Sequence, residues 1–303
     1  MNWFITGVNG FVGHHLTNLL LKNNHKIFGN GLDEKGPKNI NYHKTNILDF
    51  NKIKELIEKS QPDIICHLAG FSSVKKSFDN PKLCHDINVN GTENILKAVK
   101  ELNINPRIII ISSADLYGIP QTIPMTESHP LNAKSPYAES RIKQEAICKK
   151  YNLNIVILRS FPHIGPGQLP QFVTSSFAKQ IADIEKGIQN NTLLVGNLSA
   201  KRDFTDVRDT VKAYYLAASK CKKGETYNIC SQKSYSIQKI LDILISLSKE
   251  DIKIKVDKDR LRPSDIPILE GDNTKFIKET GWVIKKDIEE TLLDILDYWR
   301  NKN

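Results

Sequence analysis

The sequence predicts an α/β protein with a doubly wound parallel sheet, joined to a smaller mixed α/β domain. Three observations indicate this fold. A short apolar strand at residues 3–5 passes through a glycine-rich turn into an amphipathic helix. The segments 63–70 and 107–113 are almost continuously apolar, as expected of strands buried on both faces of a parallel sheet. Strand-like and helical segments then alternate up to about residue 160.

The expected elements follow in order along the chain. The expected strands are residues 3–5, 25–28, 42–46, 63–70, 107–113 and 155–159. The expected helices are the one after the glycine turn, with Leu16, Leu19 and Leu20 on one side, and residues 53–59, 81–102 and 135–151. The pattern loosens into a Pro- and Gly-rich loop from residue 162. We therefore expect one domain at 1–160, to which about 203–230 return, and a second, discontinuous domain at 161–303.

The composition is that of a globular chain that can bury a full core. The chain has 303 residues and a formal net charge of +9, but its lysines are spread along helices, so we expect a solvated surface and no nucleic-acid partner. No segment approaches the roughly 18 apolar residues that span a membrane, and we expect neither a membrane partner nor a secretory signal. The five cysteines are scattered and lack CxxC spacing, which predicts free thiols, no metal site and a cytoplasmic protein.

The N-terminal glycine turn is a candidate dinucleotide site. Glycines at this spacing allow a tight turn, close approach to a pyrophosphate, and packing of the helix whose N-terminus faces the phosphates. The glycines alone would equally fit an ordinary corner between a strand and a helix, and the flanking strand and amphipathic helix favour the cofactor site. The candidate cofactor-binding residues of this turn are Gly7, Asn9, Gly10, Phe11, Val12 and Gly13.

Residues at the ends of two further strands are expected to influence which cofactor binds and to contact it. An acidic residue at the end of the second strand would bind the adenosine ribose, and here that position is Gly31. Asp33 lies two residues too late, while Lys35 suits a phosphate, so we expect NADP(H) to be favoured over NAD(H). Leu68, Ala69 and Gly70 end the fourth strand and complete the candidate cofactor set, whereas His67 before them is interpreted as a core histidine.

A serine, a tyrosine and a cation form the candidate catalytic group. Ser113 ends the fifth strand, Tyr137 opens the following helix, and Arg141 lies four residues on, so on the same helix face. The positive charge would stabilise a phenolate, which suits a tyrosine that exchanges a proton beside a serine hydroxyl. Taken singly, each residue also fits an ordinary strand end or helix start.

Motifs along nearly the whole chain resemble those of the extended short-chain dehydrogenases/reductases. They are the glycine turn, residues 67–70, the stretch Asn88-Val89-Asn90-Gly91-Thr92, the Ser-Ser-x-x-x-Tyr-Gly segment at 112–118 and the helix tyrosine. The segments 163–168, 195–198, 202–209 and 260–267 resemble the GDP-4-dehydro-6-deoxy-D-mannose reductases and the related GDP-mannose 4,6-dehydratases. The resemblance implies a Rossmann-type cofactor domain and a smaller substrate-binding domain.

The resemblance also implies roles for individual residues. Ser113 would bind the substrate carbonyl and Tyr137 would donate the proton, with Asp115 beside them in the substrate site. Arg202 and Arg262 would bind the diphosphate of a GDP-sugar, for which the arginine fork is suited, although an exposed ion pair is their ordinary alternative. Lys179 is the next candidate for the same phosphates.

The resemblance implies that the protein uses NAD(P)H to reduce the C4 ketone of a GDP-4-keto-6-deoxy-hexose. It also implies a homodimer whose interface is formed by the helices near 81–102 and 135–151. One alternative is a nucleotide-sugar dehydratase or epimerase, since Asp115 supplies an acid next to the serine. Another is a weakened nucleotide-binding protein without turnover. This last reading is motivated by two departures from the family pattern, Arg141 where relatives have lysine and Pro162 where they have asparagine. We expect the arginine fork to span both ribose hydroxyls.

Overall fold

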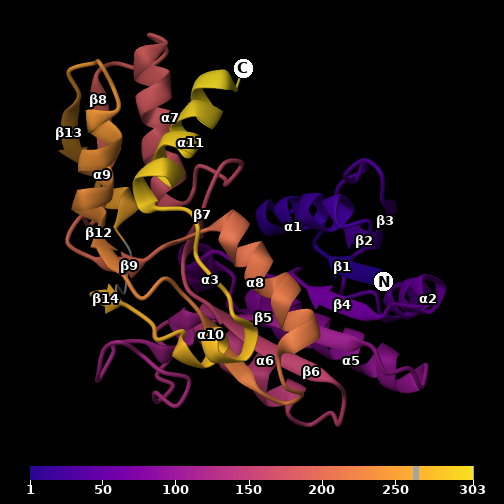
Figure 1. The fold of residues 1–303 in the computed structure, drawn as a ribbon. Helices are drawn as coiled ribbons and strands as arrows, with labels where there is room; N and C mark the ends of the chain where they lie inside the picture. The colour runs from indigo at the N-terminus through magenta and orange to yellow at the C-terminus, as the bar shows by residue number, and fades with distance from the viewer. Residues whose placement is uncertain (262–265, 303) are drawn as a thin grey trace.

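The computed structural model describes residues 1–261 and 266–302. Its centre is a parallel sheet of seven strands in the order β11-β6-β5-β4-β1-β2-β3, which confirms the predicted doubly wound fold (Figure 1). These strands are β1 (Asn2–Thr6), β2 (Lys26–Gly31), β3 (Asn41–Lys44), β4 (Ile64–His67), β5 (Arg107–Ser113), β6 (Ile155–Ser160) and β11 (Thr226–Ile229). The strand order reverses between β1 and β4, and ligands of such sheets bind at the carboxyl ends of the strands near that point.

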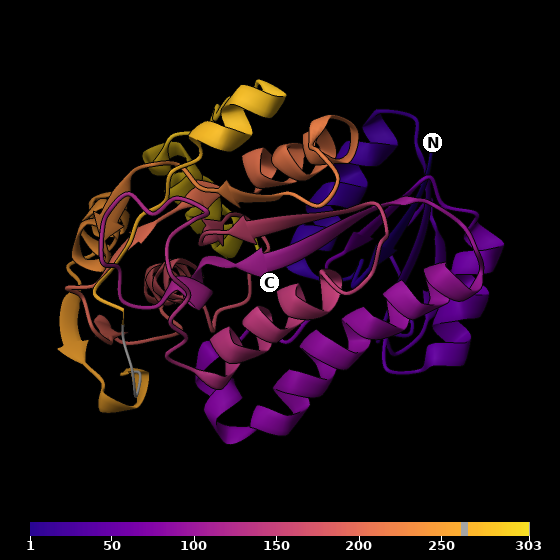
Figure 2. The same cartoon turned by 90° about the horizontal axis from the view of Figure 1, so that it is seen from below.

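Helices cover both faces of the sheet. One face carries α1 (Phe11–Lys22) and α8 (Val207–Lys220), and the other carries α2 (Phe50–Ser60), α5 (Gly91–Glu101) and α6 (Pro136–Cys148). Figure 2 shows α5 and α6 side by side beneath the strands. None of the helices in the described ranges combines the length and the apolar character needed to cross a bilayer.

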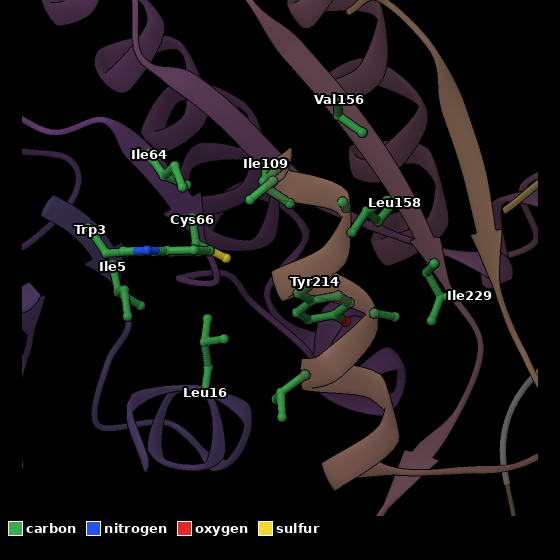
Figure 3. Packing of buried hydrophobic residues seen from close by; sticks show 14 of the residues in the cluster. Trp3, Ile5, Leu16, Ile64, Cys66, Ile109, Val156, Leu158, Tyr214 and Ile229 are labelled. Carbon is green, nitrogen blue, oxygen red and sulfur yellow. The ribbon is translucent and has the colours of Figure 1, made fainter. Parts of the chain in front are cut away.

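The strands are apolar throughout because successive side chains enter different cores. On β4, Ile64 and Cys66 pack under α1 and α8, whereas Ile65 between them packs against the opposite helices. Figure 3 shows Cys66 on the same side of the sheet as Leu16 of α1 and Tyr214 of α8. Successive side chains of a strand point to opposite faces of the sheet, so a strand is apolar at every position only when both faces are covered.

The second half of the chain builds a smaller layer beside the sheet. Its apolar core lies among α7 (Val173–Glu185), α9 (Ile237–Ser246), α11 (Ile288–Asn301) and β8 (Thr192–Val195), seen at the upper left of Figure 1. The strand β13 (Lys253–Val256) pairs with β8 in parallel and is exposed along its length. Short strands join this layer to the sheet: β7 (His163–Ile164), β9 (Lys201–Asp203), β10 (Thr205–Asp206), β12 (Ser234–Ser236) and β14 (Ile268–Leu269). The chain returns to the first core with α8 and β11, and again with α10 (Thr274–Thr280). The exact domain limits at 1–160 and 161–303 stay a prediction.

The helix predicted at about 81–102 is confirmed as a continuous helical segment over residues 81–101, which includes one π-helical turn. The structure has α3 (Val74–Asp79), α4 (Pro81–His85), a π-helical turn (Asp86–Asn90) and then α5. The side chain of Asn88 in the π turn accepts from the amide of Phe71 at 2.8 Å and donates to the Ser140 hydroxyl at 2.8 Å. These long-range bonds give a physical reason for the local change of helix type, since π turns commonly aim a side chain at a site.

Candidate active site

The glycine turn makes an open cradle before α1. Gly7 has φ of 69°, and a Cβ atom on it would lie 2.8 Å from the Cα atom of Ala69. A Cβ on Gly13 would lie 2.5 Å from the carbonyl oxygen of Gly7. No side chain in the described ranges caps α1, whose N-cap is Gly10. The first amides of this helix therefore lack a side-chain acceptor, and the glycines allow the backbone of the turn to pack closely against residue 69 and the start of α1.

The strand end at residues 68–70 lies against this turn and against α6. The amide of Ala69 donates to Thr6 Oγ1 at 3.1 Å, which ties the ends of β4 and β1 together. A Cβ on Gly70 would lie 2.9 Å from Nη2 of Arg141. Glycine at this position therefore lets the guanidinium approach the strand end, and the structure brings these sequence-predicted residues to one edge of the sheet.

The space next to Gly31 is already filled by a side chain. A Cβ on Gly31 would lie 2.4 Å from Oδ1 of Asn9, whose Nδ2 donates to the carbonyl of Lys35 at 2.7 Å. Asn9 thus lies where the ribose-binding acid of other dinucleotide folds would project. An aspartate at position 31 would displace Asn9, so this substitution is not a clean test of cofactor preference.

Ser113 and Asp115 are joined in a short turn at the carboxyl end of β5. Ser113 Oγ donates to Asp115 Oδ2 at 3.0 Å and accepts from the amide of Asp115 at 3.2 Å. Ser113 is buried and Asp115 is half-buried. The serine hydroxyl thus lies at the strand edge with its proton directed to a carboxylate.

Tyr137 is fixed by the first turn of α6. Ser135 caps the helix by accepting from the amide of Ala138 at 3.2 Å, and the proline that follows favours a helix start. The amide of Tyr137 donates to Ser77 Oγ of α3 at 3.2 Å. The guanidinium carbon of Arg141 lies 5.2 Å from the centre of the Tyr137 ring. The predicted spacing of four residues therefore places the cation over the phenol.

Arg141 is held mainly from inside the protein. Its Nη1 donates to the carbonyl of Ile111 at 3.1 Å and to Gln144 Oε1 at 3.0 Å. Its Nε is buried without a hydrogen-bond partner in the described structure. Only Nη2, beside Gly70, remains on the side of the strand ends. The expectation that both arms of the fork span the ribose hydroxyls stays a prediction, and in this structure protein oxygens accept from Nη1.

A buried ion pair that the sequence analysis missed fixes α6 against the sheet. Arg159 of β6 donates through Nε and Nη2 to Glu145 of α6, at 3.0 and 2.7 Å. Ser112, next to Ser113, donates to the same carboxylate at 2.7 Å. The phenol of Tyr117 accepts from Arg159 at 3.0 Å, and burial raises the pKa of Tyr117 to about 12. An arginine inside an apolar strand was the available signal, since a buried charge requires a partner.

The loop after β6 lies against the start of α1. The ring of His163 stacks on Phe11, with centres 6.2 Å apart and planes 11° apart. His15 of α1 hydrogen-bonds to the carbonyl of Pro166 at 2.9 Å. Burial lowers the pKa of His163, so this ring is neutral at pH 7. Pro162, the departure noted above, accepts at its carbonyl from the amide of Thr205 at 3.0 Å.

The predicted phosphate-binding residues are spread over the smaller layer. Arg202 on β9 donates through Nη1 to the carbonyl of Ile266 at 2.7 Å. Arg262 lies outside the described residues. Lys179 pairs with Asp183 on its own helix and lies 5.8 Å from the Trp299 ring of α11. The side chain of Lys179 therefore points toward α11, and these contacts do not support its prediction as a phosphate ligand.

Comparison with known proteins gives a consistent result over the whole chain. The family model of GDP-mannose 4,6 dehydratase matches residues 4–295. GDP-6-deoxy-D-mannose reductase of Pseudomonas aeruginosa is 31% identical over 305 residues, with 99% of this chain and 97% of that protein covered. GDP-6-deoxy-D-talose 4-dehydrogenase of Aggregatibacter actinomycetemcomitans is 30% identical, with 93% and 92% covered. The solved structure of RMD from Pseudomonas aeruginosa, complexed with NADPH, superposes with a TM-score of 0.88 at 30% identity, and 99% of each chain is covered.

Proposed function

Since the chain belongs to the GDP-mannose 4,6-dehydratase family of the extended short-chain dehydrogenases/reductases, we propose that it reduces the C4 ketone of a GDP-4-keto-6-deoxy-hexose with NADPH. The observation that supports the proposal is that β5, which ends at Ser113, packs against α6, which carries Tyr137 and Arg141. Ser113 ends β5, and Tyr137 opens α6 with Arg141 over its ring. The reductase and the dehydrogenase to which this chain is similar, each at least 30% identical, are both named for 6-deoxy-hexose chemistry on GDP-sugars, and this supports the substrate class.

The residues present fit a nicotinamide dinucleotide. Cβ atoms would fill the turn at Gly7 and Gly13, and the start of α1 is free of a side-chain cap in the described ranges. We assign the diphosphate to this cradle, with residues 68–70 and Nη2 of Arg141 along the ribose and nicotinamide. When bound, the reduced nicotinamide supplies the hydride.

The protein side chains handle the oxygen of the ketone. Ser113 turns its hydroxyl from Asp115 to the carbonyl oxygen and holds it by a hydrogen bond. Tyr137 gives its phenolic proton to that oxygen as negative charge develops there, which is general acid catalysis. Arg141 stays protonated and stabilises the phenolate that Tyr137 becomes.

Preference for NADP(H) is part of the proposal. Asn9, a neutral amide, occupies the position at Gly31 where an NAD-binding acid would oppose a 2′-phosphate. Lys35 is exposed on the same loop, and its backbone fixes Asn9. Its ammonium group is our candidate partner for the phosphate.

The smaller layer is proposed to hold the sugar nucleotide. Arg202 remains the candidate for the diphosphate together with Arg262. Arg260, the first residue of the segment 260–267, is a further candidate, and it pairs with Asp257 at 3.2 Å. It ends the short helix after β13 and donates to Ser176 of α7 at 2.9 Å. The backbone of Asp259 in that helix accepts from Lys75 of α3, so the phosphate candidates lie on an element that contacts the larger domain.

Dehydration is the second candidate function, because Asp115 touches Ser113. A carboxylate next to the serine suits the elimination of water across C5 and C6, as in the dehydratases that give the family its name.

One assay separates the two candidates. The purified chain is incubated with NADPH and a GDP-4-keto-6-deoxy-hexose, and the absorbance of the reduced nicotinamide is followed. The reductase proposal predicts loss of absorbance with the keto sugar and no keto product from GDP-mannose alone. A keto product from GDP-mannose alone would instead support the dehydratase, and cofactor binding with neither turnover would refute both.

We also propose a homodimer in the cytoplasm. Leu83 of α4 is 47% exposed and Phe78 of α3 is 37% exposed, next to the α5 and α6 surfaces. A second copy would cover these side chains. All five cysteines are buried and unpaired, which suits a reducing compartment. Sedimentation of the purified chain measures the oligomeric state.

A further inference from the structure

We infer that Gln144 is a positioning residue that adapts this site to arginine at position 141. The inference rests on the proposed cofactor site. Gln144 lies outside the motif of Tyr137 and Arg141 on which the family resemblance depends. Gln144 is fully buried, three residues after Arg141 on α6. Its Oε1 accepts from Nη1 of Arg141 at 3.0 Å, and its Nε2 donates to Thr92 Oγ1 of α5 at 2.9 Å.

The orientation of the Gln144 amide is fixed by the hydrogen count at Thr92. The single hydroxyl proton of Thr92 goes to the carbonyl of Asn88, at 2.7 Å. Every other partner of Thr92 Oγ1 must therefore donate to it. Gln144 meets this requirement only with its NH₂ group toward Thr92, which leaves its carbonyl oxygen facing Arg141.

The same hydrogen count also assigns the tautomer of His67, the next residue in this hydrogen-bond network. His67 Nε2 lies 3.0 Å from Thr92 Oγ1 and must donate, so the ring carries its proton on Nε2. His67 Nδ1 then accepts from Thr6 Oγ1 at 2.7 Å, and Thr6 in turn accepts from the amide of Ala69. Burial and the charge of Arg141 lower the pKa of His67 to about 3, which agrees with a neutral ring.

This hydrogen-bond network therefore connects the cation on α6 to the strand ends beside the glycine turn, and its two arms meet at Thr92 Oγ1, which accepts from both Gln144 and His67. At its arginine end, two carbonyl oxygens, of Gln144 and Ile111, hold Nη1. Because the guanidinium is planar, fixing Nη1 also fixes the position of Nη2. Nη2 then faces Gly70, the nitrogen that we assign to the cofactor. An ammonium group has no such plane, so lysine would gain little from Gln144.

A double-mutant cycle tests this dependence. The four proteins are the parent, Gln144→Met, Arg141→Lys and the double variant, and the readouts are the dissociation constant of NADPH, followed by its fluorescence, and kcat. In the arginine background, Gln144→Met should weaken NADPH binding about tenfold, because Nη2 loses its fixed position. In the lysine background, the same change should weaken binding less than about twofold.

Further variants separate positioning from damage to the fold. Gln144→Glu keeps an acceptor toward Arg141, and its second oxygen accepts the Thr92 hydroxyl proton once that proton turns away from the Asn88 carbonyl. NADPH affinity should then stay within about threefold of the parent, even if Gln144→Met does not fold. Gln180→Met removes a buried glutamine of α7, whose side chain bonds to Leu194, and should leave NADPH affinity unchanged.

Equal losses from Gln144→Met in both backgrounds, or a tenfold loss in Gln144→Glu, would overturn the inference. If the parent fails to bind NADPH, the cofactor site of the proposed function is wrong. If the parent binds and the cycle is additive, only the role of Gln144 is wrong.

Discussion

The buried pair between Glu145 and Arg159 offers a direct test of how the fold holds the site. We expect Glu145→Gln to lower the free energy of unfolding and to reduce turnover. The carboxylate accepts three hydrogen bonds, two from Arg159 and one from Ser112, and the side chains of the pair are 2% and 6% exposed. A glutamine keeps one oxygen for two of these donors but turns an NH₂ group toward the third. The buried guanidinium then faces a donor and loses its counter-charge.

Removal of one partner of a buried ion pair costs about 3 to 5 kcal/mol. Arg159 keeps two other acceptors, the Tyr117 phenol at 3.0 Å and the Glu127 carbonyl at 2.9 Å. We therefore expect the lower end, about 3 kcal/mol, which is a large part of the 5 to 15 kcal/mol that stabilises a typical domain. Because Glu145 lies on the same helix as Tyr137, kcat should fall as well.

The assay is urea unfolding followed by circular dichroism, with kcat measured on the folded variant. Glu101→Gln is the matched control, since its pair with Lys54 at 2.8 Å is more than a third exposed on both sides, and it should leave the unfolding free energy nearly unchanged. A loss below about 1 kcal/mol for Glu145→Gln would refute the reasoning.

Three further predictions concern the site. Tyr137→Phe should lower kcat about 100-fold or more while NADPH still binds, as measured by turnover of the keto sugar, and full turnover would exclude this tyrosine as the acid. Lys35→Ala should weaken NADPH about fivefold and NADH hardly at all, with Lys38→Ala, an exposed lysine of the same segment, as control, and equal effects on both cofactors would count against the phosphate contact. Burial lowers the pKa of His67 to about 3, below its unfolded value of 6.5, so stability should fall as pH drops below 6.5, by about 1.4 kcal/mol per pH unit from this ring. His67→Gln should flatten that slope in urea unfolding between pH 6.5 and 4, and an unchanged slope would mean that another group is responsible.

The sequence by itself determined the fold class, and it predicted the trio of Ser113, Tyr137 and Arg141 that we propose to be catalytic. Buried strands such as β4 are recognised from their own residues, since Ile64, Ile65 and Cys66 are apolar whichever core each one enters. The glycine turn and the pair of Tyr137 and Arg141 are equally local, because a turn needs glycine where it bends and a helix brings residues four apart onto one face.

Only the tertiary structure decided how these parts are held, because the deciding bonds join residues far apart in the chain. Asn88 bonds to Phe71 and Ser140, and these bonds accompany the π turn inside the predicted helix, which no local pattern in the sequence indicated. The approach of Asn9 to Gly31 shows that the missing acid does not leave an empty space.

The same limit applies to the charged residues. Lys179 and Arg202 look alike as phosphate ligands in sequence, but helix α7 turns Lys179 toward Asp183 and Trp299. The fork of Arg141 keeps its charge in any setting, whereas the number of its nitrogens left for a ligand depends on the carbonyl of Ile111 and the amide of Gln144. A hydrogen bond requires its partner within about 3 Å, and that distance is set by the packing of whole helices, which no local pattern records.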